Sequence, residues 1–256
     1  MKKTITFIGN GNMAFSIAKG LGESYHIEVV GRDMQKLEAF ERNLGIGVDK
    51  FLLDGFDITN KTLVVCVKPA NTDEVGSLLK GKARVVYSVL AGVSINKLKN
   101  SFCTPAVVRS MPNLAASVQK SMTTLCGEIG FRDEAIEIFN SIGATRWLGS
   151  EKEIDIATAL AGSGPAYLSL IAEALMDGAV KQGLKRDDAI SITRGLFEGF
   201  ATLVQDIHPA LLKDGVMSPG GTTAAGYGAL EEKGVRGACI DAVEKAYKKA
   251  VELGSA

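Results

Sequence analysis

The first residues that could do chemistry form a glycine-rich turn near the start of the chain. Gly9 to Ala14 read GNGNMA and fit the pattern G-x-G-x-x-G/A. They follow a short apolar run, TITFI, and precede apolar residues at helical spacing, which is the context of a dinucleotide-binding turn. Gly9 permits the tight turn, Gly11 lets the backbone approach a pyrophosphate, and Ala14 allows a helix to pack closely on a strand.

The N–H groups at the start of the following helix would face the bound anion. We therefore predict a nucleotide site formed by Gly9, Asn10, Gly11, Asn12 and Met13. The alternative interpretation is a glycine turn between a strand and a helix that binds no ligand.

The end of the second strand bears on which dinucleotide would bind. An NAD enzyme usually places Asp or Glu there, where it binds the ribose 2′-hydroxyl. This chain has Gly31 and then Arg32. A guanidinium suits a 2′-phosphate, which it holds by charge-assisted hydrogen bonds. The sequence therefore favours NADPH over NADH, with a solvated surface arginine as the alternative.

A second candidate site lies late in the chain. Ser218 to Thr223 read SPGGTT and stand immediately before a helical pattern. The N–H groups of Gly221, Thr222 and Thr223 would point outward at a helix N-terminus, and the hydroxyls of Ser218 and Thr223 add donors. The segment could hold a small carboxylate, although such a sequence taken alone is more often a capped loop.

Strands alternating with short helices must position the first of these sites. The predicted strands are residues 4–8, 26–30, 62–67, 84–90, 104–109 and 121–126. This alternation predicts βαβ units and a doubly wound, mostly parallel sheet. No strand candidate follows Ile154. We therefore expect an α/β Rossmann-type domain over residues 1–150 and an all-α domain over residues 151–256.

The helix predicted over residues 165–182 carries few charges. Glu173, Asp177 and Lys181 are four residues apart and form one narrow polar stripe. A helix with so little polar surface must be buried on most sides, which about 100 residues cannot easily achieve alone. We expect the helical domain to associate with a second copy of itself. The alternative is that this helix packs wholly against its own sheet.

Composition excludes several classes of function. Lys plus Arg equals Asp plus Glu at 29 each, so the basic surplus of a nucleic-acid binder is absent. Four scattered cysteines and two histidines give no metal-ligand spacing, and isolated thiols indicate a reducing, cytoplasmic location. No stretch reaches the roughly 18 apolar residues expected of a membrane span, and the apolar run before Gly9 is too short for a secretory signal.

The chain resembles the pyrroline-5-carboxylate reductase family over almost its whole length. The matching segments are FIGNGNMA (7–14), VKP (67–69), AGV (91–93), VVRSMPN (107–113), ALAGSGPAYL (159–168) and LLKDGVMSPGGTTAAGYGALE (211–231). The family reduces 1-pyrroline-5-carboxylate to L-proline with a nicotinamide cofactor. The resemblance implies a Rossmann domain and a helical domain that interlocks with its twin in a homodimer; rings of dimers also occur in the family.

The resemblance also implies roles for single residues near the substrate. Ser218, Gly221, Thr222 and Thr223 would hold the substrate carboxylate. The Thr223 hydroxyl would lie near the imine nitrogen, first to orient it and second to deliver a proton. Asp206 would lie near the substrate amine, with a surface acid at a helix end as the alternative. Many relatives carry Asn where this chain has Gly215, which puts one cofactor contact in doubt.

Further cofactor contacts are expected where strands end. Lys68-Pro69 ends the third strand at the carboxyl edge of the sheet, and Asn113 follows another strand in the same way. A structural turn is the alternative for both. The expected set is Val67, Lys68, Pro69, Ala91, Gly92 and Asn113, with Ala91 and Gly92 beside the nicotinamide.

Two other functions remain open from the sequence. A β-hydroxyacid dehydrogenase, or another imine reductase, shares the two-domain plan. The hydroxyacid enzymes usually carry a catalytic lysine on the long interdomain helix, whereas the only lysine between Pro165 and Gly183 is Lys181 at the far end. A non-catalytic nucleotide sensor would need the glycine turn without an acid-binding loop, and the intact Ser218–Thr223 segment argues against it.

Overall fold

The computed structural model describes residues 2–255, apart from the side chains of Leu253 and Ser255. The described residues form two compact units: 2–163 with 245–255, and Gly164–Glu244.

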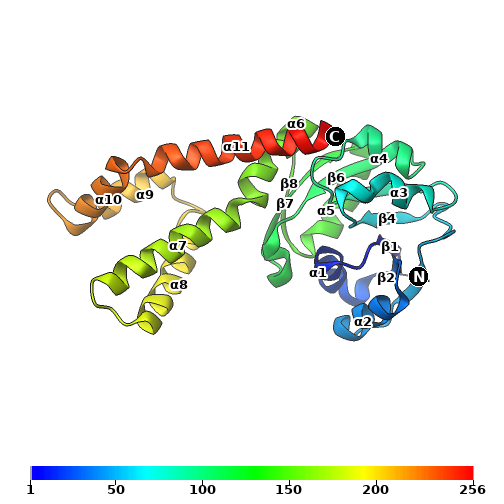
Figure 1. Cartoon of the computed structure of the whole chain (residues 1–256), viewed down its shortest axis with the longest axis horizontal. Helices are drawn as coiled ribbons and strands as arrows, with labels where there is room; N and C mark the ends of the chain where they lie inside the picture. Colours follow the sequence, from blue (N-terminus) through cyan, green and yellow to red (C-terminus); the bar gives the residue numbers. More distant parts are fainter. Residues whose placement is uncertain (1, 256) are drawn as a thin grey trace. The chain divides into compact units, whose positions relative to one another are not determined.

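One eight-stranded sheet forms the centre of the first unit, in the order β3-β2-β1-β4-β5-β6-β7-β8 (Figure 1). The strands are β1 (Thr4–Ile8), β2 (His26–Gly31), β3 (Asp49–Leu52), β4 (Thr62–Val65), β5 (Val85–Ser88), β6 (Val107–Met111), β7 (Ser121–Gly127) and β8 (Gly143–Trp147). Neighbours are parallel except β6 and β7. The expected Rossmann-type, mostly parallel sheet is thereby confirmed.

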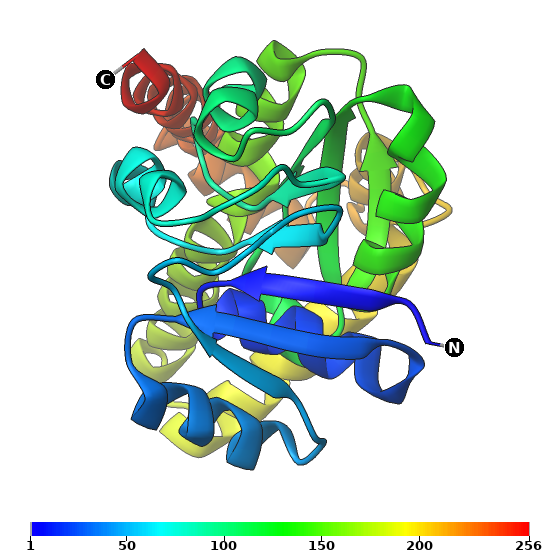
Figure 2. The same cartoon turned by 90° about the vertical axis from the view of Figure 1, so that its right-hand side faces the viewer.

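Helices cover both faces of this sheet (Figure 2). They are α1 (Asn12–Leu21), α2 (Met34–Leu44), α3 (Thr72–Ser77), α4 (Ile95–Ser101), α5 (Arg132–Asn140) and α6 (Glu151–Ala157). Because side chains alternate along a strand, Ile5 and Phe7 of β1 join the core under α1, α2 and α5, whereas Ile8 joins the core under α3 and α4. Both faces of the central strands are therefore buried.

The last strands are tied to α6 by a buried ion pair network. Arg109 of β6 is 3% exposed. Its Nη1 lies 3.1 Å from Oε1 of Glu151, and its Nη2 lies 2.6 Å from Oδ1 of Asp155. Glu151 Oε1 also accepts from the backbone N–H of Ile95 at 2.8 Å. These contacts place α6 on the sheet and make it part of the first unit.

Arg109→Met is expected to lower the free energy of unfolding of the first unit by about 2 kcal/mol, because two partly buried carboxylates lose a charged donor. Urea unfolding followed by the fluorescence of Trp147, the only tryptophan, measures it. The control is Lys3→Met, which removes an exposed pair with Glu137 and should cost no more than about 1 kcal/mol. Equal losses in the two variants would show that the buried Arg109 ion pairs stabilise the unit no more than the exposed Lys3–Glu137 pair does.

The compact units divide the chain later than the predicted domain limit at residue 150. α6 and the π-helical turn Thr158–Gly162 stay with the sheet. Besides the Arg109 ion pairs, Nδ2 of Asn113 donates to the Ala161 carbonyl at 3.0 Å. Residues 151–162 therefore stay with the sheet, and the second unit begins at Gly164.

The second unit is all-helical. It comprises α7 (Gly164–Lys181), α8 (Arg186–Leu203), α9 (Pro209–Val216), α10 (Thr222–Glu232) and the first part of α11 (Val235–Ser255). α7 and α8 lie side by side (Figure 1). As predicted, no strand follows residue 154 in the part of the chain that the structure describes.

The helices of the second unit enclose almost no hydrophobic core. In residues 164–244 only Ala189 and Thr193 are buried. Large apolar side chains on α7 and α8 are exposed, among them Leu168, Leu170, Leu175, Ile192, Leu196 and Phe200. Such a surface needs a covering partner.

By length and composition alone, the continuous helical stretch Glu151–Lys181 could cross a membrane. The sequence-based expectation concerned an unbroken run of roughly 18 apolar residues, which this stretch does not contain, so it stays an expectation. Only 11% of the most apolar part of this stretch is buried. A core helix of a soluble protein passes the same test, so the finding is weak evidence for a membrane span.

Candidate functional site

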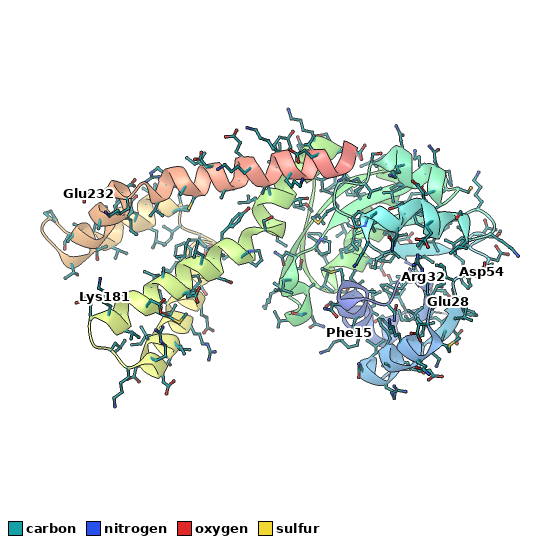
Figure 3. The ribbon with its side chains drawn as sticks, in the orientation of Figure 1. Phe15, Glu28, Arg32, Asp54, Lys181 and Glu232 are labelled. Atoms are coloured by element: carbon teal, nitrogen blue, oxygen red, sulfur yellow. The ribbon has the colours of Figure 1, made fainter. Side chains whose placement is uncertain are left out.

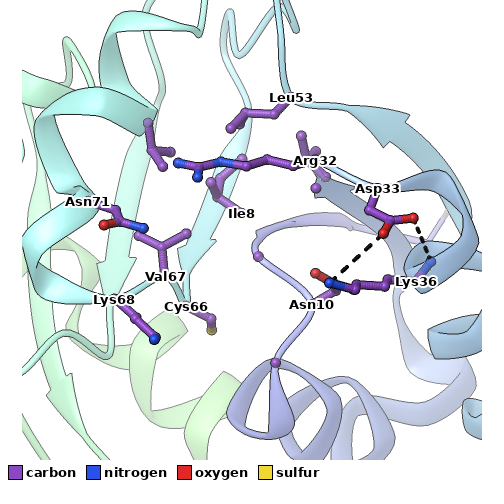
Figure 4. A pocket seen from close by; sticks show the side chains of 15 residues that line it. Ile8, Asn10, Arg32, Asp33, Lys36, Leu53, Cys66, Val67, Lys68 and Asn71 are labelled. Atoms are coloured by element: carbon purple, nitrogen blue, oxygen red, sulfur yellow. Dashed lines mark hydrogen bonds and ion pairs between the residues drawn. The ribbon is translucent and has the colours of Figure 1, made fainter.

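A cavity of about 420 Å³ opens at the carboxyl ends of β1, β2 and β4 (Figure 4). Val67, Lys68 and Asn71 line one side, and Asn10, Asp33 and Lys36 line the other. The remaining lining residues are Ile8, Gly9, Gly11, Val30, Gly31, Arg32, Leu53, Cys66 and Val75. Ligands bind at this edge in doubly wound sheets, so the cavity is the candidate nucleotide site.

Gly9 makes the turn that ends β1. Its φ is +104°, which favours glycine, and a Cβ at this position would lie 2.9 Å from the carbonyl oxygen of Cys66. Its N–H donates to the Val30 carbonyl at 2.8 Å. The turn therefore stays close to β2 and β4 only with glycine at this position.

Gly11 differs from Gly9, because neither its backbone nor its neighbours demand glycine. It is the N-cap of α1 with a φ of −78°, and a Cβ there would meet no atom within 4 Å. The first helical bond runs from the Phe15 N–H to the Gly11 carbonyl, so the N–H groups of Asn12 and Met13 are not used inside the helix. Open space before free N–H groups is what a pyrophosphate requires.

A second hollow of about 430 Å³ continues from this turn along α1 and α2. Asn10, Gly11 and Lys36 line both hollows. Asn12 lines only the second one, and Met13 packs against the core instead. The glycine turn thus lies where the two hollows meet.

Positive charge gathers at the end of β2 (Figure 3 labels Arg32). Gly31 leaves no carboxylate there, and Arg32 and Lys36 both line the cavity. Asp33 follows directly, but its Oδ1 caps α2 by accepting from the N–H groups of Gln35 and Lys36 at 3.0 and 3.3 Å. Its acid is therefore committed to the helix start. This corner fits a 2′-phosphate better than a bare 2′-hydroxyl.

The turn after β4 supplies the opposite wall. Val67 and Lys68 line the cavity as predicted, and Pro69 opens a 3₁₀ turn through Asn71. Asn71 lines the cavity too, and its N–H donates to the Lys68 carbonyl at 2.9 Å. Sequence reasoning missed Asn71 and Lys36; the signal was available, since both stand at the starts of helices that follow sheet strands.

Six predicted cofactor residues do not line this cavity: Asn12, Met13 and Pro69, which lie in its turns, and Ala91, Gly92 and Asn113. Gly92 has a φ of +73°, and a Cβ there would lie 3.0 Å from the Gly254 nitrogen, so the end of α11 requires a glycine. Ala91 packs against a small core cluster with Met111 and Ile154. Asn113 caps the turn Leu114–Val118 through its Oδ1 and donates to Ala161. Their contacts with a cofactor stay predictions.

The second candidate site begins with a tight turn. The Gly221 N–H donates to the Ser218 carbonyl at 3.0 Å, and Gly220 has a φ of +70°. With Pro219 at the second position this is the pattern of a type II turn. A Cβ on Gly221 would lie 2.5 Å from Ser218 Oγ. The serine hydroxyl therefore lies close to the backbone that starts α10.

The start of α10 leaves donors unused by the helix. Gly221 is the N-cap without a side-chain cap, and the first helical bond runs from the Ala225 N–H to the Gly221 carbonyl. The N–H groups of Thr222 and Thr223 are thus available, and both side chains are exposed. An anion at this place would meet amide N–H groups, hydroxyls and the positive end of the helix dipole.

Side chains that the sequence did not point to hold α10 in place. Tyr227 donates to Glu231 at 2.6 Å, and Nη2 of Arg236 donates to the Tyr227 hydroxyl at 2.6 Å. Lys213 of α9 lies 5.5 Å from the centre of the Tyr227 ring. The Glu231 hydrogen bond is the main cause of a raised pKa for Tyr227. Asp206 is exposed between α8 and α9.

No group of three or more His, Cys, Asp or Glu that could hold a metal ion occurs within residues 2–255. Burial raises the pKa of the Cys126 thiol to about 11 and also raises the pKa of Cys66. Neither thiol is a nucleophile at neutral pH. The first candidate site offers amide N–H groups and cations, and the second offers amide N–H groups and hydroxyls.

Comparison with known proteins shows which family the chain is similar to. The family model "Pyrroline-5-carboxylate reductase dimerisation" matches residues 151–253, and "NADP oxidoreductase coenzyme F420-dependent" matches residues 4–92. The chain is 38% identical to a pyrroline-5-carboxylate reductase of Pisum sativum, over 98% of this chain and 96% of the relative. It is 33% identical to one of Helicobacter pylori, over 96% and 98%.

Solved structures give the same result. The chain superimposes on a 1-pyrroline-5-carboxylate reductase of Streptococcus pyogenes with a TM-score of 0.84 at 28% identity, covering 97% and 98% of the two chains. A pyrroline carboxylate reductase of Plasmodium falciparum with NADP bound gives 0.79 at 26% identity, covering 98% of each chain. The similarity spans both units.

Proposed function

Because the chain belongs to the pyrroline-5-carboxylate reductase family, we propose that it reduces 1-pyrroline-5-carboxylate to L-proline with NADPH. The observation that carries the proposal is the pairing, in one chain, of a glycine turn open for a pyrophosphate with a helix start open for a small carboxylate. Full-length similarity to enzymes of that name supports it.

The residues at the carboxyl edge fit NADPH. The nucleotide supplies a hydride to the imine carbon when bound. Gly9, Asn10 and Gly11, with the N–H groups of Asn12 and Met13, would hold its pyrophosphate. Val67, Lys68 and Pro69 would contact it from the turn after β4. We also propose that Ala91 and Gly92 lie beside the nicotinamide and that Asn113 contacts the cofactor.

The start of α10 would hold and orient the substrate. Its carboxylate would accept from the N–H groups of Gly221, Thr222 and Thr223 and from the Ser218 hydroxyl. Thr223 Oγ1 would then orient the ring nitrogen. A hydroxyl is a weak acid at neutral pH, so proton delivery by Thr223 is the lesser role, and a protonated imine can arrive from water. Asp206 would favour the positive charge on that nitrogen.

Arg32→Ala should raise the KM for NADPH about tenfold and change the KM for NADH little, because only NADPH carries a 2′-phosphate for the guanidinium. Initial rates at saturating pyrroline-5-carboxylate with each nucleotide measure this. Equal changes for the two nucleotides would remove the 2′-phosphate assignment.

The substrate class is tested by NADPH oxidation with pyrroline-5-carboxylate and with a panel of β-hydroxyacids and their oxo forms. We expect turnover with the imine alone. Turnover only with the panel would favour a hydroxyacid dehydrogenase, although α7 bears no lysine before Lys181 in its last turn (Figure 3). Absence of turnover with every compound would favour a nucleotide sensor.

The helical unit belongs to a homodimer, as the dimerisation family to which it is similar indicates. The exposed apolar side chains of α7 and α8 support this association. We further propose that dimers assemble into rings and that the enzyme is cytoplasmic. The free cysteines Cys66, Cys103, Cys126 and Cys239 fit a reducing compartment.

A further inference from the structure

Arg32 already has a partner that the proposed reaction does not explain. Its Nη2 lies 3.0 Å from Oε2 of Glu74, in the first turn of α3. The two side chains are 51% and 59% exposed. An exposed pair of this kind adds little to stability. The main effect of the contact is therefore electrostatic: the Glu74 carboxylate offsets the positive charge of Arg32 at the cavity.

The surroundings make Glu74 the acid that bears most directly on Arg32. Arg32 and Lys36 line the cavity from the β2 side. Asp33 caps α2 through Oδ1, and its Oδ2 lies 3.9 Å from Lys36 Nζ. Glu74 comes instead from the opposite wall, where its neighbour Val75 lines the cavity. The carboxylates of Asp33 and Glu74 thus offset the charges of Lys36 and Arg32, and Glu74 forms an ion pair with the guanidinium itself.

A 2′-phosphate would compete with Glu74 for Arg32. Its charge is about −1.5 to −2 at pH 7, and a guanidinium binds phosphate through the same paired N–H groups that it offers a carboxylate. A nucleotide with a 2′-hydroxyl makes no such demand and leaves the ion pair intact. The Glu74 carboxylate therefore opposes the binding of a nucleotide with a 2′-phosphate and does not affect the binding of one with a 2′-hydroxyl.

We propose that Glu74 is a specificity-determining residue. It lowers the affinity of this enzyme for NADPH and so makes its preference for NADPH over NADH smaller. It neutralises Arg32 when no 2′-phosphate is bound, and it must be displaced, against like-charge repulsion, when one binds. The proposal rests on the role of Arg32 under the proposed function. The affinity for 2′-phosphorylated nucleotides is accordingly lower than Arg32 and Lys36 alone would provide.

The test compares Glu74→Gln with Asp73→Asn. Asp73 is the adjacent acid on α3, but it faces α4, where Oδ1 accepts from Ser101 at 2.7 Å and Oδ2 lies 3.6 Å from Lys97 Nζ. Both variants remove one negative charge from the same helix. Isothermal titration calorimetry with adenosine 2′,5′-bisphosphate and with 5′-AMP reads the 2′-phosphate site without turnover. Titrations with NADPH and NADH follow.

Glu74→Gln should tighten the binding of the bisphosphate and of NADPH about three- to tenfold and leave 5′-AMP and NADH unchanged. Asp73→Asn should change none of the four. Unchanged bisphosphate affinity in Glu74→Gln would overturn the proposal, as would an equal gain for 5′-AMP or an equal gain in Asp73→Asn. Arg32→Ala tests the role of Arg32 separately from that of Glu74. If Arg32→Ala lowers the affinity for the bisphosphate and not for 5′-AMP, while Glu74→Gln changes neither affinity, only the proposed role of Glu74 is contradicted.

Discussion

Gly11→Val is expected to weaken NADPH binding at least about 100-fold while the protein stays folded. Gly11 has an ordinary φ of −78° and no neighbour within 4 Å of a Cβ, so a valine fits the free protein. The same space is where a pyrophosphate must approach the start of α1, and a branched side chain would fill it. Quenching of NADPH fluorescence or calorimetry measures the affinity.

The control is Gly47→Val, at another exposed glycine with an ordinary φ and no neighbour within 4 Å, which lies outside both hollows. It should leave NADPH affinity unchanged. Valine is a poorer N-cap than glycine, so Gly11→Val should cost up to about 1 kcal/mol of stability. NADPH binding by Gly11→Val at the parent affinity would contradict a pyrophosphate at this turn.

Thr223→Ala should lower kcat/KM for pyrroline-5-carboxylate about 100-fold and leave the Kd for NADPH unchanged. The variant removes a hydroxyl that would point at the substrate from the start of α10. The loss of one hydrogen bond to a charged group, in the bound substrate or in the transition state, has an effect of this size. Steady-state kinetics at saturating NADPH, together with NADPH titrations, separate the two quantities.

Two further variants sharpen this test. Thr223→Ser keeps the hydroxyl and should recover most of the lost kcat/KM. Thr202→Ala removes a helical threonine of the same unit, whose Oγ1 donates to the Glu198 carbonyl, and should change nothing in the kinetics. If Thr223→Ala altered only the affinity for NADPH, the substrate would be bound elsewhere.

The central strands were predictable and the edge strands were not, for one physical reason. β1, β4 and β5 are buried on both faces and therefore read as continuous apolar runs. β3 and β8 form the two edges of the sheet, where half-exposed residues keep polar side chains such as Asp49 and Arg146. Their sequences, DKFL and GATRW, lack the apolar run.

The reversal of direction between β6 and β7 could have been foreseen. Only a short 3₁₀ turn, Leu114–Val118, separates Met111 from Ser121. A parallel connection needs a crossover of a dozen or more residues. The spacing therefore already required an antiparallel pair.

The candidate site was predictable where it depends on one local turn. Gly9 and Gly11 act through backbone conformation within a few residues, which a motif records. Glu74 reaches Arg32 from α3 because the sheet order places β4, which precedes α3, beside β1, and a pattern along the chain does not contain that neighbour. The structural role of Gly92 was missed for the same reason, since its partner Gly254 lies far along the chain, whereas a structural turn at Asn113 was foreseen as the alternative.

The most direct test of the central claim is the transfer of an isotopic label. The enzyme is incubated with NADPH deuterated at the reactive C4 position and with pyrroline-5-carboxylate, and the product is analysed by mass spectrometry and NMR. The proposed reaction predicts L-proline with one deuterium on C5 for each NADPH consumed, because the former imine carbon receives the hydride and the ring nitrogen receives a proton from water. NADPH left unconsumed, or proline formed without deuterium at C5, would contradict it.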